Sequence, residues 1–223
     1  MKSKKKILIA DSRGWFVPAS PLEDHSLVYY ISKPDELSIE AVAGMAPDVI
    51  FFVHWSYIVP RQIHENYESI VFHTAPLPFG RGGSPIQNLI LAGHESAPVC
   101  ALKMTEDIDA GPIYSKVEIS LLGNLSAIFS RISAAVNSLI IKILTENPKP
   151  VAQRGDVHVF RRLSKESNRI DGRMTPKQIY DRIRMVDSPE YAPAFIEIED
   201  LTIELRGAKY DGESVKAQCT LKN

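Results

Sequence analysis

The chain has 223 residues, of which 44% are hydrophobic and 24% charged, and its formal net charge is −1. This composition is typical of a globular domain with a small appendage, and the charge balance excludes a field that would attract nucleic acid over the whole chain. The two cysteines, Cys100 and Cys219, are too few for a disulfide framework, and the apolar run around Cys100 predicts a buried thiol. The apolar run after the basic start is too short for a signal peptide, and the longest apolar stretches are too short for a membrane span. We therefore expect a cytoplasmic protein.

The first half of the chain predicts alternating strands and helices. Apolar runs of strand length occupy residues 7–10, 27–31, 48–53 and 69–72. A four-residue apolar spacing predicts a helix over 34–45. Continuous apolar strands separated by helices indicate an α/β fold, a Rossmann-like and mostly parallel sheet with helices on both faces.

Helix signals continue through the second half. Ser84 and Thr175 each precede a proline and have glutamine three residues later, which predicts two helices that begin with capping boxes. Between them an apolar stripe predicts a long helix over 125–144, whose stripe either packs across the sheet, the favoured interpretation, or binds a partner. Residues 195–205 alternate apolar and acidic side chains around Glu199-Asp200, which predicts a hairpin. The expected domains are 1–155 and a linker with a small helix and β-hairpin over 156–223.

Two segments combine residues that could carry chemistry. HTAPLPFGRGGSP, residues 73–85, places a histidine after a predicted strand, and its glycines allow backbone to approach a ligand. MTEDIDAGPI, residues 104–113, places Glu106, Asp107 and Asp109 before a glycine-proline turn; a carboxylate beside a histidine can orient it for proton transfer. A turn-rich loop and an acidic surface turn are the competing interpretations.

Other active sites are not supported by spacing. The sequence has no GxGxxG after the first strand, no P-loop and no GxSxG elbow. His54, His64 and His73 fit no zinc pattern, and we expect His25, His64, His94 and His158 at the surface. Dinucleotide, phosphate-loop, serine-hydrolase and zinc enzymes are therefore not predicted.

HTAPLPFGRGGSPIQNLILAGH followed by MTEDIDAGPIY resembles the folate-dependent formyltransferases, which include methionyl-tRNA formyltransferase, glycinamide ribonucleotide transformylase and the nucleotide-sugar N-formyltransferases. The 36 residues that separate His73 from Asp109 suit that family, and the resemblance covers roughly residues 45–195. It is nearest to a branch found beside pseudaminic acid-type sugar genes and as formylation domains of peptide synthetases.

The resemblance implies a role for each matching residue. His73 and Asp109 would be the catalytic pair, and 10-formyltetrahydrofolate would be the co-substrate, without a metal. The co-substrate would be held by Trp55, Ser56, Tyr57, Val59 and Asp107, and the acceptor by Arg81, Gly82, Asn88 and Arg161.

Val71 departs from the family, which has asparagine two residues before the histidine. That asparagine helps to bind the formyl oxygen, and loss of such a donor costs about 3 kcal/mol of transition-state stabilisation. Asn88, His54 or a backbone N–H near Gly82 would have to replace it, or activity is lost.

The acceptor is expected to be small. Residues 194–205 carry four acidic side chains and no basic one, whereas RNA binding depends on cationic contacts to phosphate. We therefore expect a UDP- or TDP-4-amino-4,6-dideoxy sugar, no nucleic acid and no membrane. An aminoacyl carrier, formyl-folate hydrolysis and a non-catalytic folate-binding module are alternatives, and the hairpin edges leave a homodimer open.

Overall fold

The computed structural model describes residues 4–19, 22 and 26–222. These residues form two compact units, each assembled from separate stretches of chain. The first unit contains residues 1–81, 98–119 and 132–158, and the second contains 82–97, 120–131 and 159–223. The division predicted near residue 155 stays a prediction.

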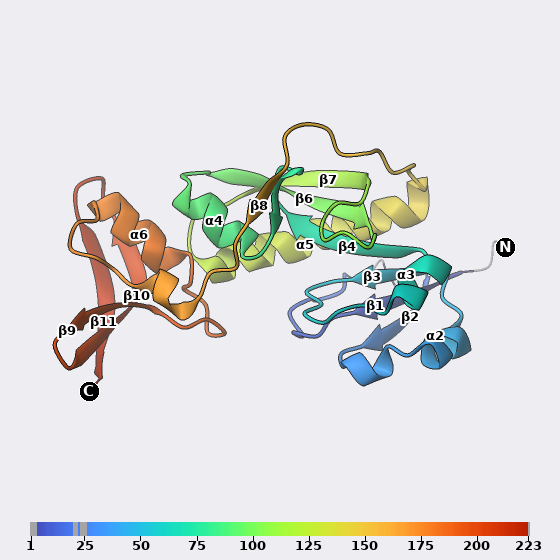
Figure 1. The fold of residues 1–223 in the computed structure, drawn as a ribbon, viewed down its shortest axis with the longest axis horizontal. Helices are drawn as coiled ribbons and strands as arrows, with labels where there is room; N and C mark the ends of the chain where they lie inside the picture. The colour runs from blue at the N-terminus through green and yellow to red at the C-terminus, as the bar shows by residue number, and fades with distance from the viewer. Residues whose placement is uncertain (1–3, 20–21, 23–25, 223) are drawn as a thin grey trace. The chain divides into compact units, whose positions relative to one another are not determined.

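A six-stranded sheet has the order β2-β1-β3-β4-β6-β7 (Figure 1). Its strands are β1 (Lys5–Ala10), β2 (Ser26–Ile31), β3 (Val49–Phe52), β4 (Ser69–Thr74), β6 (Ser96–Lys103) and β7 (Ile113–Ser120). Strands β2, β1, β3 and β4 pair in parallel, and β4 pairs with β6 in the antiparallel sense. The predicted α/β fold with a mostly parallel sheet is confirmed, and the sheet is mixed because β6 runs antiparallel to β4.

Both faces of the central strands are buried. Ile7, Leu8, Ile9 and Ala10 of β1 are each 0% exposed, and successive strand residues point to opposite faces. On one face, Leu8 and Ala10 belong to a cluster with Ile50 and Phe52 of β3. The helices α2 (Ile39–Met45) and α3 (Arg61–Asn66) contribute the buried side chains that the cluster also contains, Val42 and Ile63.

The helix expected over 34–45 is two pieces. A 3-10 turn η1 (Pro34–Glu36) comes first, and α2 begins only after Ser38, whose hydroxyl accepts from the N–H of Ala41. Because Ser38 satisfies the first turn of a new helix, the two pieces are separate.

The long helix α5 (Leu125–Glu146) confirms the prediction over 125–144. Its stripe is buried, and none of the following is more than 6% exposed: Leu125, Ile128, Ile132, Val136, Leu139, Ile140 and Ile143. Within the described part of the chain, α5 is the one helix whose length and composition would suit a membrane span. Its buried stripe identifies it as a core helix.

The second unit contains α4 (Pro85–Leu91), the 3-10 turn η2 (Lys165–Asn168), α6 (Pro176–Arg184) and an antiparallel sheet with the order β11-β10-β9. Strands β9 (Ala194–Ile198) and β10 (Leu201–Tyr210) form the predicted hairpin, with the turn at Glu199-Asp200. The sequence did not indicate the third strand, β11 (Val215–Lys222). Strands β5 (Phe79–Gly82) and β8 (His158–Phe160) form a separate two-stranded sheet and belong to neither unit alone.

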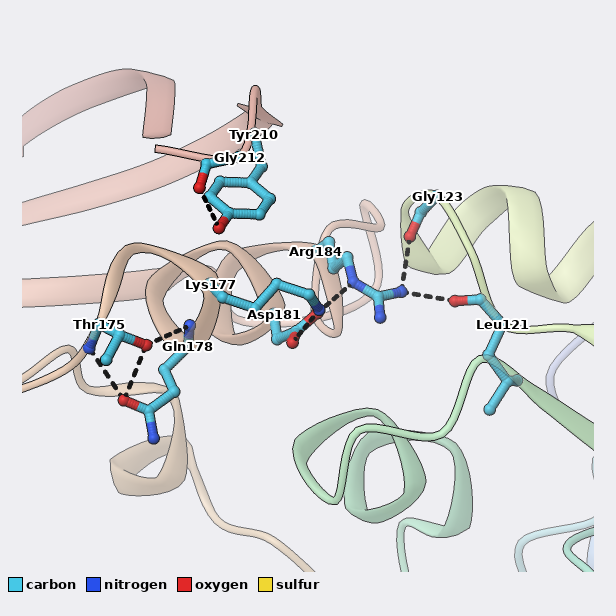
Figure 2. A network of polar contacts seen from close by, with 9 residues as sticks. All are labelled: Leu121, Gly123, Thr175, Lys177, Gln178, Asp181, Arg184, Tyr210 and Gly212. Carbon is cyan, nitrogen blue, oxygen red and sulfur yellow. Dashed lines mark hydrogen bonds and ion pairs between the residues drawn. The ribbon is translucent and has the colours of Figure 1, made fainter. Parts of the chain in front are cut away.

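A buried ionic network anchors α6, as Figure 2 shows. Arg184 is 3% exposed, its Nε donates to Asp181, and its Nη1 donates to the carbonyls of Leu121 and Gly123. Lys177 is the second cation on the Asp181 carboxylate. Because Asp181 and Arg184 are largely removed from water, each depends on the other for compensation, whereas Lys177 is half exposed.

The two predicted capping boxes had different outcomes. Thr175 caps α6 as predicted, with its hydroxyl accepting from the N–H of Gln178 (Figure 2). The capping box predicted at Ser84 is wrong, because Ser84 has a left-handed backbone (φ 50°) and makes no side-chain cap. Its hydroxyl instead accepts from the N–H of Leu163, which ties α4 to the segment after β8.

Candidate active site

His73 lies within β4, opposite Cys100 of β6, and not in the loop after the strand as the sequence predicted. It is 8% exposed. Its Nδ1 lies 3.3 Å from a carboxylate oxygen of Asp109, and its Nε2 lies 2.7 Å from the Gly80 carbonyl oxygen. The structure therefore brings together the two residues predicted as the catalytic pair.

The two contacts of His73 restrict where protons can be. A carbonyl oxygen can only accept, so Nε2 carries hydrogen, and Nδ1 faces a carboxylate. The arrangement is fully satisfied when both ring nitrogens carry hydrogen beside an ionised Asp109, or when Asp109 itself carries the proton. In either form the pair holds one proton between two heavy atoms, which is the arrangement that proton transfer needs.

Asp109 belongs to the turn between β6 and β7 and has a left-handed backbone (φ 54°). Its side chain is 13% exposed. Two residues later, Gly111 lies so close to β6 that an added Cβ would stand 1.7 Å from the Lys103 carbonyl oxygen. The N–H of Lys103 donates to the carbonyl of Pro112 at 2.9 Å, so close backbone packing fixes the turn that carries the carboxylate.

Arg81 and the Asp109 turn share one partner, Gln153. The side-chain oxygen of Gln153 accepts from Nε and Nη2 of Arg81, at 3.1 and 2.8 Å. Its amide nitrogen donates to the carbonyls of Asp109 and Gly111, at 2.8 and 2.9 Å. The sequence did not single out Gln153, because a glutamine in a polar connection has no distinctive local pattern.

The residues predicted to hold the co-substrate follow β3. Strand β1 has β2 on one side and β3 on the other, so the segments after β1 and β3 lie at a topological switch point, where open α/β sheets bind ligands. The two segments are joined there, since Ser12 Oγ accepts from the N–H of Ser56 at 3.0 Å and Arg13 Nε donates to the Ser56 hydroxyl at 2.9 Å.

Aromatic side chains line the segment after β3. Trp55 makes edge contacts with Phe52 and Tyr57, at centroid separations of 6.2 and 5.6 Å. Its indole N–H is buried and has no partner among the described residues. Tyr57 is 51% exposed, and Val59 packs partly against the cluster of β1 and β3. Asp107 is exposed in the Asp109 turn.

His54 has a left-handed backbone (φ 51°) between β3 and Trp55. Its ring contacts Trp15 edge-on at 5.4 Å. Burial lowers the pKa of His54 below its ordinary value, although the charge of Asp11 opposes the shift. The neutral imidazole is therefore the form that this position favours.

Gly82, Asn88 and Arg161 belong to the second unit. The amide nitrogen of Asn88 donates to the carbonyls of Gly83, Ser84 and Arg161, at 3.0 to 3.1 Å. Its two hydrogens are thus used by backbone carbonyls, and the Arg161 side chain is exposed. Their roles toward an acceptor, and that of Asn88 toward a formyl oxygen, stay predictions.

Val71 lies on the same face of β4 as His73, because alternate strand residues share a face. It packs against the cluster of Leu8, Ile50 and Phe52. At the position where the resemblance to the folate-dependent formyltransferases predicts asparagine, this chain has an apolar side chain that extends the core.

Other predicted positions are as follows. Cys100 is 1% exposed, which confirms the predicted buried thiol. His158 and His94 are exposed, His64 is partly exposed, and His25 lies outside the described residues. Among the described residues, no three or more metal-binding side chains gather in a group that could hold a metal ion.

Comparison with known families identifies the chain. Residues 18–144 match the family described as formyl transferase, and residues 165–222 match the C-terminal domain of methionyl-tRNA formyltransferase. The chain belongs to the formyl transferase family. This confirms the family that the His73 and Asp109 segments predicted.

Solved structures agree with this family. A methionyl-tRNA formyltransferase from Clostridium thermocellum is 35% identical with a TM-score of 0.91, and the match covers 98% of this chain and 99% of that one. HypX from Aquifex aeolicus in complex with tetrahydrofolic acid is 20% identical (TM-score 0.79), over 92% of this chain and 38% of that one. A sugar N-formyltransferase from Shewanella sp. is 16% identical (TM-score 0.70), over 91% and 97%. The last two show a shared fold alone.

Curated relatives are longer than this chain. A methionyl-tRNA formyltransferase from Sulfurihydrogenibium sp. is 24% identical over 88% of this chain and 68% of that protein. Another, from Bacillus velezensis, is 30% identical over 67% of this chain and 50% of that protein. The predicted nearness to the sugar branch stays a prediction, since the matches of higher identity are methionyl-tRNA formyltransferases.

Proposed function

We propose that the chain transfers the formyl group of 10-formyltetrahydrofolate to a primary amine, with His73 and Asp109 as the catalytic pair. The observation that carries the proposal is the buried contact of 3.3 Å between His73 Nδ1 and Asp109, held on the opposite side by the Gly80 carbonyl. Membership of the formyl transferase family supports the same reaction.

The His73–Asp109 pair supports formyl transfer in two ways: it stabilises the negative charge on the formyl oxygen, and it accepts the proton that the amine loses. The amine nitrogen forms a bond to the formyl carbon, the bond from that carbon to the folate nitrogen breaks, and negative charge develops on the formyl oxygen. The N–H of His73 that now donates to Gly80 would be shared with this oxygen and would stabilise it. Asp109 fixes the ring and accepts the proton that the amine loses, which is returned to the leaving nitrogen.

The segment after β3 suits a flat heterocycle. Trp55 and Tyr57 supply aromatic surface, and the indole N–H of Trp55 is a buried donor without a partner among the described residues. Buried donors normally have an acceptor, so a ligand oxygen or nitrogen would satisfy it. The co-substrate supplies the formyl group, and this chain supplies its orientation and the proton transfer.

For the acceptor we propose a nucleotide-linked amino sugar. Residues 165–222 contain ten lysines and arginines against eleven aspartates and glutamates, so this segment has no cationic excess for RNA phosphates. The Arg81 guanidinium has N–H groups beyond the two that Gln153 uses, which suits a diphosphate.

The second candidate acceptor is an aminoacyl-tRNA. It is favoured by the match of residues 165–222 to the C-terminal domain of methionyl-tRNA formyltransferase. The two acceptors differ in salt dependence, because RNA binding through many phosphates weakens steeply as salt rises.

The test is formyl transfer with the folate donor, read as a mass gain of the acceptor, over a panel of UDP- and TDP-amino sugars and methionyl-tRNA. We expect product with a nucleotide sugar, and a loss of about 10³-fold in kcat for His73→Ala and Asp109→Asn. His64→Gln on α3 is the matched control and should keep the wild-type rate. Product from tRNA alone would replace the sugar proposal, and folate binding without transfer to any amine would overturn the enzymatic one.

A further inference from the structure

Gln153 connects two parts of the first unit that are far apart in sequence. Arg81 is in β5, Asp109 and Gly111 are in the turn before β7, and Gln153 is in the segment after α5. The four contacts from the Gln153 amide are between 2.8 and 3.1 Å. They use both its hydrogens and its oxygen, so each part of the amide has a fixed role.

The chemistry of the amide determines what each contact does. Its oxygen faces the Nε and Nη2 edge of the Arg81 guanidinium, and this directs the remaining Nη1 hydrogens away from Gln153. Its nitrogen binds the carbonyls on both sides of Ala110, at Asp109 and Gly111. The left-handed backbone of Asp109 is thus held by a side chain from another segment.

We propose that Gln153 is a positioning residue, which fixes the Asp109 turn for proton transfer and the Arg81 guanidinium for an anionic acceptor. The proposal rests on the proposed function for its kinetic consequences, whereas the hydrogen bonds themselves can be tested without activity. Because one amide makes both sets of contacts, displacement of Arg81 is transmitted to the turn that carries the catalytic carboxylate.

Two substitutions distinguish the role of the Gln153 amide oxygen from the role of its amide nitrogen. Gln153→Leu removes all four contacts at similar volume. Gln153→Glu keeps an acceptor for Arg81 but places a carboxylate oxygen against the carbonyls of Asp109 and Gly111. A misplacement on the order of 1 Å in an active site can lower the rate about 10²-fold, so we expect kcat to fall about 10- to 100-fold in both variants.

The acceptor KM distinguishes positioning from a general loss of structure. Gln153→Leu and Arg81→Ala should raise the acceptor KM, whereas Gln153→Glu should leave it near the wild-type value. Gln218→Leu on the exposed strand β11 is the control, since none of the hydrogen bonds described in this structure uses the Gln218 side chain. The kcat and KM of this variant should stay at the wild-type values. Equal KM values for Gln153→Leu and Gln153→Glu, or a kcat within about twofold of the control, would overturn the proposal.

A second measurement does not depend on turnover. The Nε–H signal of Arg81 in ¹⁵N NMR spectra should be protected from exchange in the wild type and in Gln153→Glu, and should be lost in Gln153→Leu. Unprotected Arg81 in the wild type would refute the positioning role. Wild-type protection without formyl transfer to any amine would refute the proposed function and leave the hydrogen bonds established. If Gln153→Leu does not fold, the shorter Gln153→Asn replaces it, with the same expectations.

Discussion

Substitution of Gly111 by alanine tests whether the turn that carries Asp109 is held by backbone packing. An added Cβ would lie 1.7 Å from the Lys103 carbonyl oxygen and 2.9 Å from the Lys103 carbonyl carbon, both of which are backbone atoms that cannot rotate away. Side-chain β-carbons essentially never approach within 3.0 Å, so the turn and β6 must separate by about 1.3 Å.

A separation of this size moves the Asp109 carboxylate out of contact with His73, from its present 3.3 Å. We expect kcat/KM for formyl transfer to fall at least about 10²-fold, because a 1 Å misplacement can have that effect. Insertion of a methyl group into a packed site should also destabilise the protein by about 1–3 kcal/mol.

The assays are single-turnover formyl transfer, read by mass, and urea denaturation of the same samples. Gly44→Ala is the matched control, because a Cβ at Gly44 in α2 meets nothing within 4 Å. It should keep the wild-type rate and gain up to about 1 kcal/mol of stability, since alanine is the better helix former. If Gly111→Ala matched Gly44→Ala in rate and denaturation midpoint, the inferred packing of the turn would be refuted.

Three further outcomes follow from the structure. Arg184→Met should cost about 3–5 kcal/mol in urea denaturation, because it leaves buried acceptors unpaired, whereas Lys177→Met, at a half-exposed cation, should cost less than about 1 kcal/mol. Burial lowers the pKa of His54 from 6.5, so the folded state binds fewer protons than the unfolded state. The contribution of His54 to the free energy of unfolding is therefore present above pH 6.5 and is lost as pH falls through the folded pKa. Urea denaturation of the wild type and of His54→Gln over this pH range should show the difference. Burial raises the pKa of the Cys100 thiol to about 11, so a thiol reagent should modify only the exposed Cys219 until the protein unfolds.

A specific result would refute each of these three predictions. Equal costs for Arg184→Met and Lys177→Met would mean that the α6 network does not depend on burial. The same pH dependence in His54→Gln as in the wild type would assign that dependence to other groups. Two thiols modified in the native protein would contradict the buried position of Cys100 in β6.

Local sequence was sufficient to predict a strand, a helix or a turn where one physical effect dominates. The apolar run at 48–53 indicated a buried strand, and the apolar stripe of α5 indicated a helix with one buried face. Thr175 caps α6 because its hydroxyl and Gln178 are both within one helical turn. Glu199-Asp200 turns the β9–β10 hairpin because the alternation reverses there.

Hydrogen-bond partners from distant segments explain what the sequence did not predict correctly. Ser84 has the residues of a capping box, yet its hydroxyl binds Leu163, 79 residues later, and its backbone is left-handed. The polar helix α6 gave no sign that Arg184 is buried, because its compensating carbonyls come from Leu121 and Gly123.

The sequence by itself predicted the α/β fold through apolar periodicity, and its resemblance to the folate-dependent formyltransferases implied the family and the pairing of His73 with Asp109. Only the tertiary structure determined how that pair is held. Gly111 against Lys103, Gly80 against His73, and Gln153 between Arg81 and the Asp109 turn are contacts between distant segments. A hydrogen bond or a close approach of this kind requires two groups to meet in space, and neither group carries a local pattern that names its partner.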